Sequence, residues 1–381
     1  MDDIVITSWA PGSDPVDPVD QAVPAAVAGL LERAGLGLEA DVEVWALARR
    51  DGRLVGCMGL AGDLVKDVVV DQGLRGHNLM AGLLTELRHQ AVARGRTRLS
   101  CYTRPSLAAV FASLGFRALA QADGLAVLME DDPRGVERYQ ADLAASRREG
   151  ERIAAVVLNA NPFSLGHQHL LRLAARDCDL VHVFVLGEDR SQFSPAERFA
   201  LVRDGLAALP EHDRFVLHPG SRYIVSRLTF PQYFLKDQAD IARAHAGIDL
   251  QLFRQRVAPV LGIRHRFVGS EPTSRITAHY NQEMRRWLQS PQADWPTIEV
   301  HQVERLEVGG RPVSATRVRQ ALAAGRFDQL AELVPATTWD YLVRRPPRAE
   351  PAPLGPPAPP RRQGGRSQPP DDHRQAKELS C

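Results

Sequence analysis

The stretch best suited to chemistry is a loop that leads from a predicted strand into a predicted helix. Residues 153–158 form a continuous apolar and partly β-branched run, which is typical of a strand buried on both faces in a parallel sheet. Asn159 and Asn161 end that strand, and the spacing of apolar residues becomes helical from Gly166. Free backbone N–H groups and the dipole of a helix N-terminus attract anions, so the loop predicts a phosphate site.

Two histidines, His167 and His169, supply further donors at this loop. The string Asn-Pro-Phe-Ser-Leu-Gly-His at 161–167 resembles the TxGH phosphate loop of the HIGH-motif nucleotidyltransferase superfamily, with Ser164 in place of the usual threonine. The resemblance implies that Gly166 lets a nucleotide approach the backbone and that His167 contacts phosphates in the transition state. For this motif alone, an ordinary strand–loop–helix with a solvated histidine remains the alternative.

A second motif lies well downstream, at 313–319, and reads Val-Ser-Ala-Thr-Arg-Val-Arg. It resembles the ISSTxxR motif that closes the nucleotide site in the same superfamily. Ser314 can cap a helix over 315–324, while the hydroxyls of Ser314 and Thr316 and the guanidinium of Arg319 can meet the β and γ phosphates. Capping alone would explain Ser314 but not a second motif in the correct order, so the pair of motifs indicates the superfamily.

The wider string 159–167, together with Phe-Pro-Gln-Tyr-Phe-Leu-Lys-Asp at 230–237, resembles the citrate (pro-3S)-lyase ligase family, also called acetate-citrate lyase ligase. The predicted catalytic residues are His167, Arg319 and Lys236. The residues expected to bind the nucleotide are Asn159, Asn161, Phe163, Ser164, Gly166, His167, His169, Glu271, Ser314, Thr316 and Arg319. No protein side chain is predicted to bind a metal ion.

Two of these residues have alternative roles. The aromatic loop that ends in Lys236 fits no regular period, so it either forms a pocket wall for the acyl substrate or carrier arm, or plugs the side of the core. Lys236 accordingly either meets a carboxylate or phosphate, or is solvated. Glu271 follows a predicted strand, and the family resemblance gives a glycine-acid-proline loop followed by Tyr280 and Asn281. Glu271 either borders the adenosine or is an exposed loop acid.

The region from residue 150 alternates strands with helices. Strands are predicted over 153–158, 180–186, 214–217, 264–268 and 298–303, and helices over 166–176 and 195–209. This order predicts a Rossmann-like parallel sheet with right-handed crossovers, in which ligands gather at the carboxyl ends of strands. Ser194 and Glu197 form a capping box at the start of the second helix. Arg198 either reaches phosphate or covers the surface of that helix, and the surface role is favoured.

The first part of the chain has a helix over 23–36, strands over 42–48, 54–60 and 65–70, and a helix from Leu79. This mixed α/β order resembles the GNAT acetyltransferase fold. Residues 72–80 match its pyrophosphate loop, but Asn78 and Met80 stand where a glycine or small residue is usual, so free acetyl-CoA should bind poorly. The resemblance implies recognition of a CoA-like group on a carrier protein; a retained fold without a ligand is the alternative.

Length and composition set the wider frame. A length of 381 residues predicts an α/β protein of two domains and a tail. The resemblances imply a GNAT-like domain at 1–149 and a nucleotidyltransferase-like (HUP-type) domain at 150–345, and the composition predicts a disordered Pro- and Arg-rich tail at 346–381. The balance of 47 Lys and Arg against 46 Asp and Glu argues against nucleic acid or an anionic membrane as a partner. No apolar run has the length of a membrane span, so a cytoplasmic protein is expected.

The resemblance implies an acid–thiol ligase that uses ATP and Mg²⁺. Acetate would be adenylated, pyrophosphate would leave, and the acetyl group would pass to the prosthetic thiol of the citrate lyase acyl-carrier subunit, which activates citrate lyase. Two alternatives remain from the sequence: an adenylyltransferase of the phosphopantetheine or nucleotide type, and a non-catalytic regulator that binds a nucleotide.

Overall fold

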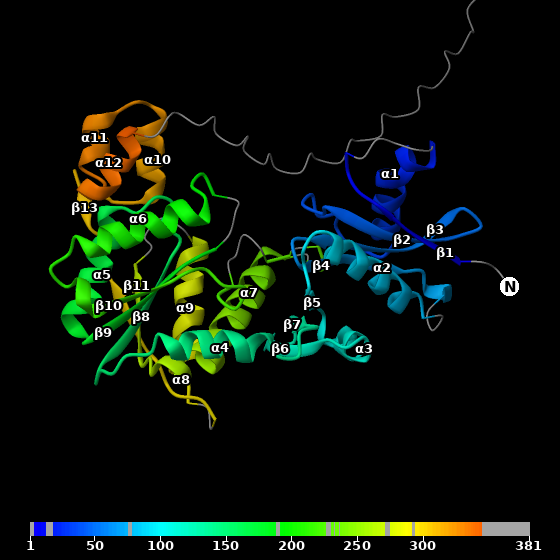
Figure 1. Cartoon of the computed structure of the whole chain (residues 1–381), viewed down its shortest axis with the longest axis horizontal. Coiled ribbons are helices and arrows are strands. Elements are labelled where there is room, and N and C mark those ends of the chain that lie inside the picture. The colour runs from blue at the N-terminus through cyan, green and yellow to red at the C-terminus, as the bar shows by residue number, and fades with distance from the viewer. Residues whose placement is uncertain are drawn as a thin grey trace, which may run out of the picture. The chain divides into compact units, whose positions relative to one another are not determined.

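The computed structural model describes residues 4–12, 18–74, 78–187, 191–225, 230–231, 233–235, 237–270, 275–291 and 294–344 (Figure 1). The described residues all lie in one compact unit, Met1–Arg345. The predicted tail at 346–381 lies outside the described residues, and the division at residue 149 within this unit stays a prediction. None of the described helices is long and apolar enough to cross a membrane.

The N-terminal part contains a seven-stranded mixed sheet in the order β1-β2-β3-β4-β5-β7-β6. Its strands are β1 (Ile4–Trp9), β2 (Val44–Arg50), β3 (Arg53–Ala61), β4 (Leu64–Val70), β5 (Ser100–Thr103), β6 (Arg117–Ala122) and β7 (Ala126–Glu130). Its helices are α1 (Pro18–Arg33), α2 (Leu79–Ala93) and α3 (Ala108–Ser113). All strand pairs are antiparallel except β4 and β5, which pair in parallel over two residue pairs. The predicted mixed α/β class is confirmed.

Local sequence explains these elements. Asp51 and Gly52 have φ angles of 51° and 76°, which close the predicted hairpin between β2 and β3. Helix α2 buries Leu79, Leu83 and Leu84 on one face, as their helical spacing predicts. These leucines pack against residues of β2 and β3, so one face of the sheet is closed by this helix.

The second sheet has five parallel strands in the order β10-β9-β8-β11-β12. They are β8 (Ile153–Leu158), β9 (Leu180–Val185), β10 (Phe215–His218), β11 (His265–Gly269) and β12 (Glu299–Val303). The chain runs outward from β8 to β10, then returns to place β11 on the other side of β8. The predicted Rossmann-like sheet is therefore confirmed, and it has a topological switch point between β8 and β11.

Helices surround this second sheet (Figure 1). They are α4 (Gly135–Ala145), α5 (Leu165–Asp177), α6 (Pro195–Ala207), α7 (Gln238–Leu252), α8 (Ala258–Leu261), α9 (Arg275–Gln289), α10 (Ala315–Ala323), α11 (Phe327–Ala331) and α12 (Ala336–Arg344). Two hydrophobic clusters cover the two faces of the sheet, one with α5 and α6 and the other with α7, α8 and α9. A short hairpin of β13 (Glu307–Val308) and β14 (Arg311–Pro312) leads into α10.

The aromatic loop that contains Phe230 and Phe234 plugs the core, one of its two predicted roles. These two rings are 3% and 6% exposed. They pack with Tyr102 of β5 and with residues of β6, β7 and α7, and the Tyr102 and Phe230 ring centroids are 4.8 Å apart. Lys236 itself lies outside the described residues. A shared hydrophobic cluster therefore joins the first sheet to α7.

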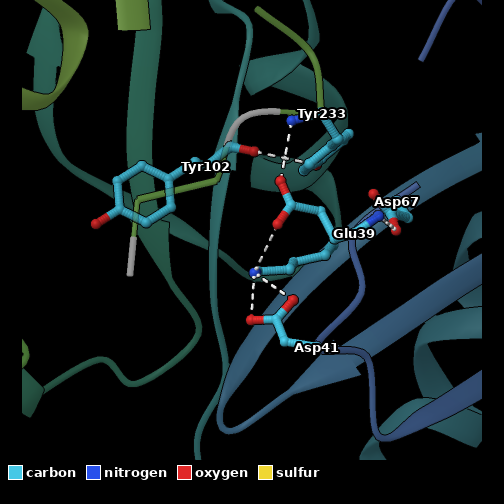
Figure 2. Close-up of polar contacts among 6 residues, drawn as sticks. Glu39, Asp41, Asp67, Tyr102 and Tyr233 are labelled. Carbon is cyan, nitrogen blue, oxygen red and sulfur yellow. Dashed lines mark hydrogen bonds and ion pairs between the residues drawn. The ribbon is translucent and has the colours of Figure 1, made fainter. Parts of the chain in front are cut away.

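A buried group of charges ties the same loop to β4 (Figure 2). Lys66 is 3% exposed, and its Nζ lies 2.9 Å from Asp41 and 3.3 Å from Glu39. Glu39 also accepts a hydrogen bond from the Tyr233 backbone N–H (3.1 Å), while its own N–H donates to Asp67 (3.0 Å). Both carboxylates thus neutralise one buried amine, and Glu39 joins three segments of the chain.

Asp67 makes the stability of this region depend on pH. Its side chain is fully buried, and burial raises its pKa to about 7 from an ordinary value of 3.8. The folded state therefore holds a proton that the unfolded state loses between these values, so stability falls as pH rises from about 4 through 7. We expect Asp67→Asn to raise the melting temperature more at pH 8 than at pH 5, because only part of this loss of stability has developed at pH 5. An equal change at both pH values, measured by thermal unfolding, would contradict this assignment.

Candidate nucleotide site

The loop that follows β8 lies at the switch point of the parallel sheet. The chain leaves β8 at Leu158 and enters α5 at Leu165, while the neighbouring β11 ends at Gly269. Because these strands are parallel, both carboxyl ends open on the same edge of the sheet. Crevices at such points receive ligands in open α/β sheets. The predicted phosphate loop therefore occupies the position that the topology favours.

Arg198 of α6 holds this loop from inside. Its side chain is fully buried, and its Nη1 donates to both the carbonyl oxygen (3.0 Å) and the side-chain Oδ1 (2.7 Å) of Asn159. Asn161 Oδ1 in turn accepts a hydrogen bond from the Phe193 backbone N–H (3.2 Å). The expectation that Arg198 covers the helix surface was wrong, because its charged end is used to fix the loop. The predicted capping box of Ser194 and Glu197 is present at the start of α6.

His167 is oriented by the residue that caps its helix. The Ser164 backbone N–H donates to His167 Nδ1 over 3.0 Å, and the Ser164 hydroxyl lies 2.9 Å from the same nitrogen. A nitrogen that accepts from a backbone amide carries no proton, so the neutral ring carries its proton on Nε2. The Phe163 ring is fully buried and stacks on the imidazole with centroids 5.8 Å apart. His167 is therefore held as a neutral hydrogen-bond donor.

The surroundings of His167 keep it neutral. Burial lowers its pKa from 6.5 to about 4, and the positive charge of Arg305 acts in the same direction. Arg305 follows β12, and its Nε donates to the carbonyl oxygen of Ser270 (2.6 Å), which lies just beyond β11. Our sequence analysis missed Arg305. The available signal was its place after a predicted strand, at the same edge of the sheet as the phosphate loop.

The two sequence motifs meet in space. Arg319 of α10 donates to the Asn161 carbonyl oxygen (2.6 Å) and to the Thr316 hydroxyl (3.1 Å). Gly166 packs so closely on the second motif that an added Cβ would lie 2.9 Å from the Val313 carbonyl oxygen. A side chain at that position would therefore push the motifs apart. The predicted cap is also present, because Ser314 Oγ accepts the N–H of Arg317 (3.3 Å).

A positively charged cavity adjoins this contact. It has a volume of 410 Å³, and its lining includes Ser314 and four arginines, Arg305, Arg311, Arg317 and Arg326, but no carboxylate among the residues that the structure describes. Arg317 also donates to the carbonyl oxygens of Arg311 (2.8 Å) and Pro312 (2.9 Å), which holds the turn before α10. Such a lining suits a polyanion.

The structure brings some of the predicted site residues together and leaves others apart from them or undescribed. Asn159, Asn161, Gly166, His167, Thr316 and Arg319 lie in or beside the contact between the two motifs, and Ser314 begins the helix there. Phe163 and Ser164 are 0% and 1% exposed and support His167 from behind. His169 is partly exposed in the second turn of α5. Glu271 and Lys236 lie outside the described residues.

The residues of the two motifs fit a nucleoside triphosphate better than a free metal ion. The described contacts of the site are made by a neutral imidazole, guanidinium groups, hydroxyls and two helix N-termini, all of which can donate to phosphate oxygens. Mg²⁺ prefers carboxylate, phosphate and water oxygens. The described contacts therefore suit phosphate oxygens and do not themselves supply the ligands that Mg²⁺ prefers.

Comparisons with known proteins agree with the two motifs. The model of the citrate lyase ligase C-terminal domain matches residues 153–342. The curated citrate pro-3S-lyase ligase of Klebsiella pneumoniae is 45% identical over 319 residues, which are 84% of this chain and 92% of that protein. The corresponding protein of Escherichia coli (strain K12) is 43% identical over 84% of this chain and 90% of its own length.

Several solved structures that are similar to the N-terminal part carry the names of acyltransferases or acetyltransferases. An acyl-CoA N-acyltransferase from Pseudomonas aeruginosa is 20% identical, covers 34% of this chain and 100% of its own, and has a TM-score of 0.28. An aminoglycoside 6'-N-acetyltransferase complexed with coenzyme A is 15% identical, with coverage of 33% and 95% and a TM-score of 0.27. The curated relatives, by contrast, extend over both sheets at more than 40% identity. The chain therefore belongs to the citrate lyase ligase family of enzymes.

Proposed function

We propose that this protein is an ATP-dependent acid–thiol ligase that acetylates the prosthetic thiol of the citrate lyase acyl-carrier subunit. In the first step a carboxylate oxygen of acetate attacks the α-phosphorus of ATP, and pyrophosphate leaves. In the second step the carrier thiol loses its proton and attacks the acetyl carbonyl, and AMP leaves with the bonding electron pair. The relatives carry the name of such a ligase, which supports the reaction class.

The observation that supports the first step best is the neutral, oriented His167. Its Nε2–H is available because Ser164 occupies Nδ1. A donor fixed in advance stabilises charge that develops on the leaving pyrophosphate without reorganising. Arg319 lies against the same loop and supplies positive charge from the second motif. Little covalent chemistry is asked of the protein in this step, so its remaining task is to align acetate with the α-phosphorus.

We propose a separate role for the N-terminal part, residues 1–149, in recognising the CoA-like group of the carrier. Asn78 precedes α2 with a φ angle of 54°, in the left-handed region that asparagine tolerates. An asparagine side chain there still blocks the close backbone approach that a glycine would allow. Weak intrinsic affinity would suffice for an arm tethered to a docked carrier, because tethering raises its local concentration.

Exchange of radiolabelled pyrophosphate into ATP tests the proposal. With the full chain we expect exchange that depends on acetate, and acetylation of the carrier when carrier is added. An adenylyltransferase would release pyrophosphate with a nucleotide or phosphopantetheine acceptor and without acetate. A non-catalytic regulator would bind ATP with no exchange for any short carboxylic acid. Either of these two results would overturn the ligase proposal.

A further inference from the structure

Three potential metal ligands converge at the far end of the nucleotide-binding sheet. His265 Nδ1 lies 3.0 Å from His301 Nε2 and 3.5 Å from a carboxylate oxygen of Glu299. The same carboxylate oxygen lies 3.7 Å from His301 Nε2. Of the residues that the structure describes, these alone form such a cluster of His, Cys, Asp or Glu. Neither sequence motif includes any of the three.

The strand register brings these side chains together. His265 pairs with Glu299, and Phe267 pairs with His301, in the parallel ladder of β11 and β12. Alternate residues of a strand share a face, so all three ligands project from one side of the sheet. The His301 ring also stacks on Phe267 with centroids 4.5 Å apart. The backbone ladder and this aromatic contact position the ligands before any ion binds.

The spacing of the donor atoms suits one small cation. Atoms separated by 3.0, 3.5 and 3.7 Å can all lie at about 2.0–2.2 Å from a single ion, the usual distances for zinc bound by histidine and carboxylate. Two imidazoles and one carboxylate favour Zn²⁺ or a similar transition metal ion over Mg²⁺ and Ca²⁺, which prefer oxygen ligands. We propose that His265, Glu299 and His301 form a binding site for a Zn²⁺-like divalent ion.

Binding requires one change of tautomer. In this structure one of the two facing nitrogens donates a hydrogen bond to the other. An ion needs the lone pairs of both, so the donating ring moves its proton to its other nitrogen. Solvent access permits this exchange and leaves room for a water ligand, because the side chains of His265, His301 and Glu299 are 12%, 24% and 59% exposed.

A second pair of facing histidines, His182 and His218, lacks two features of the proposed metal site. His182 Nδ1 lies 2.8 Å from His218 Nε2 between β9 and β10, with a similar stacking of His218 on Phe184. These two histidines are 0% and 6% exposed, and they have no carboxylate within ligand distance in the described part of the chain. That pair is an internal hydrogen bond. Glu299 and solvent access distinguish the proposed metal site from it.

The site lies away from the phosphate loop. His265 and Glu299 are the first residues of their strands, whereas the phosphate loop and Arg305 follow the carboxyl ends of the same sheet. Strand β12 forms one edge of the sheet and is hydrogen-bonded only to β11 among the described strands. An ion held by both strands would therefore clip the edge strand in place and take no part in the proposed reaction.

Metal titration of the tag-free, metal-stripped full chain tests this site, with Zn²⁺ measured by calorimetry and Co²⁺ by visible absorption. We expect one tight equivalent of Zn²⁺ and a tetrahedral Co²⁺ spectrum. Glu299→Gln and His301→Asn should weaken binding at least tenfold and remove that spectrum, while circular dichroism stays unchanged. The matched control is His89→Asn, since His89 is an exposed histidine beside a single carboxylate, Glu86 (3.8 Å).

The outcomes separate the metal site from the proposed reaction. Zn²⁺ affinity equal in the wild type and in both cluster variants would overturn the site, as would binding lost only in His89→Asn. Acetate-dependent exchange should persist in Glu299→Gln, because the clip is remote from the phosphate loop. If exchange is lost together with Zn²⁺ binding in that variant, the ion is coupled to the reaction, and the assigned separation is refuted.

Discussion

His167→Ala should lower acetate-dependent pyrophosphate exchange by about 100- to 1,000-fold, because removal of one preorganised donor to a transition-state oxyanion costs about 2.7–4 kcal/mol. The fold should survive, since the described contacts of the ring are with Phe163 and Ser164 of its own loop. ATP affinity should fall much less than the exchange rate. His212→Ala is the matched control: His212 is a surface histidine that lies 3.2 Å from Asp213, and its removal should leave exchange unchanged.

The same assignment predicts the pH profile. With a pKa of about 4 in the free protein, His167 remains a neutral donor above about pH 5. Its folded pKa lies below the ordinary 6.5, so the stability that it contributes is present above pH 6.5 and is lost as pH falls toward 4. The kcat/KM profile of exchange should therefore show no step near pH 6.5 that disappears in His167→Gln. Such a step would show that a protonated imidazole acts instead.

The sequence predicted those parts of the fold in which apolar residues follow one clear pattern along the chain. The apolar runs at 153–158 and 180–186 become β8 and β9 within a residue at their ends, and Ser194 begins α6 as its capping box predicts. Both phosphate motifs were found for a related reason: each is a helix start whose residue types follow from anion binding and capping. Their contact through Arg319 and Asn161 required the structure.

Helix α7 shows why another part could not be predicted. It buries Ile241, Ala244 and Ile248 against the first sheet. On its other side it buries Ala246 and Leu250 in the cluster that α7, α8 and α9 form with the second sheet. A helix buried on two sides carries no single apolar stripe, so the 3.6-residue period is obscured. Gly247 makes the helix harder to recognise in the sequence. Glycine is needed at this position because an added Cβ would lie 2.8 Å from Ala122. Helix packing therefore selects a residue with poor helix propensity there.

The buried arginine of the site was missed for a similar physical reason. An arginine in the first turn of an amphipathic helix is usually exposed, and nothing local shows that Arg198 faces a polar loop at the end of β8. Its partner Asn159 is far away in sequence, and their contact depends on the crossover from β9 to α6. Tertiary contacts of this kind leave no periodic signal in the sequence.

Lys66→Met should produce the largest loss of stability that we predict outside the nucleotide site. The substitution preserves much of the side-chain volume but removes the amine that both Glu39 and Asp41 approach in Figure 2. Removing one partner of a buried ion pair costs about 3–5 kcal/mol, since the remaining charges stay desolvated. We expect the lower end of this range, because the side chains of Glu39 and Asp41 are 17% and 29% exposed.

Native-state hydrogen exchange measures this loss where it should occur, at the Tyr233 backbone amide that donates to Glu39. Its protection should fall in Lys66→Met and recover substantially when Glu39→Gln and Asp41→Asn are added, because both amides remain acceptors without a net charge. Arg203→Met removes an exposed ion pair with Asp204 and should leave protection unchanged. If the triple variant is no more protected than Lys66→Met, the loss comes from packing of the lysine stem, and the charge balance around Lys66 is not what holds this loop to β4.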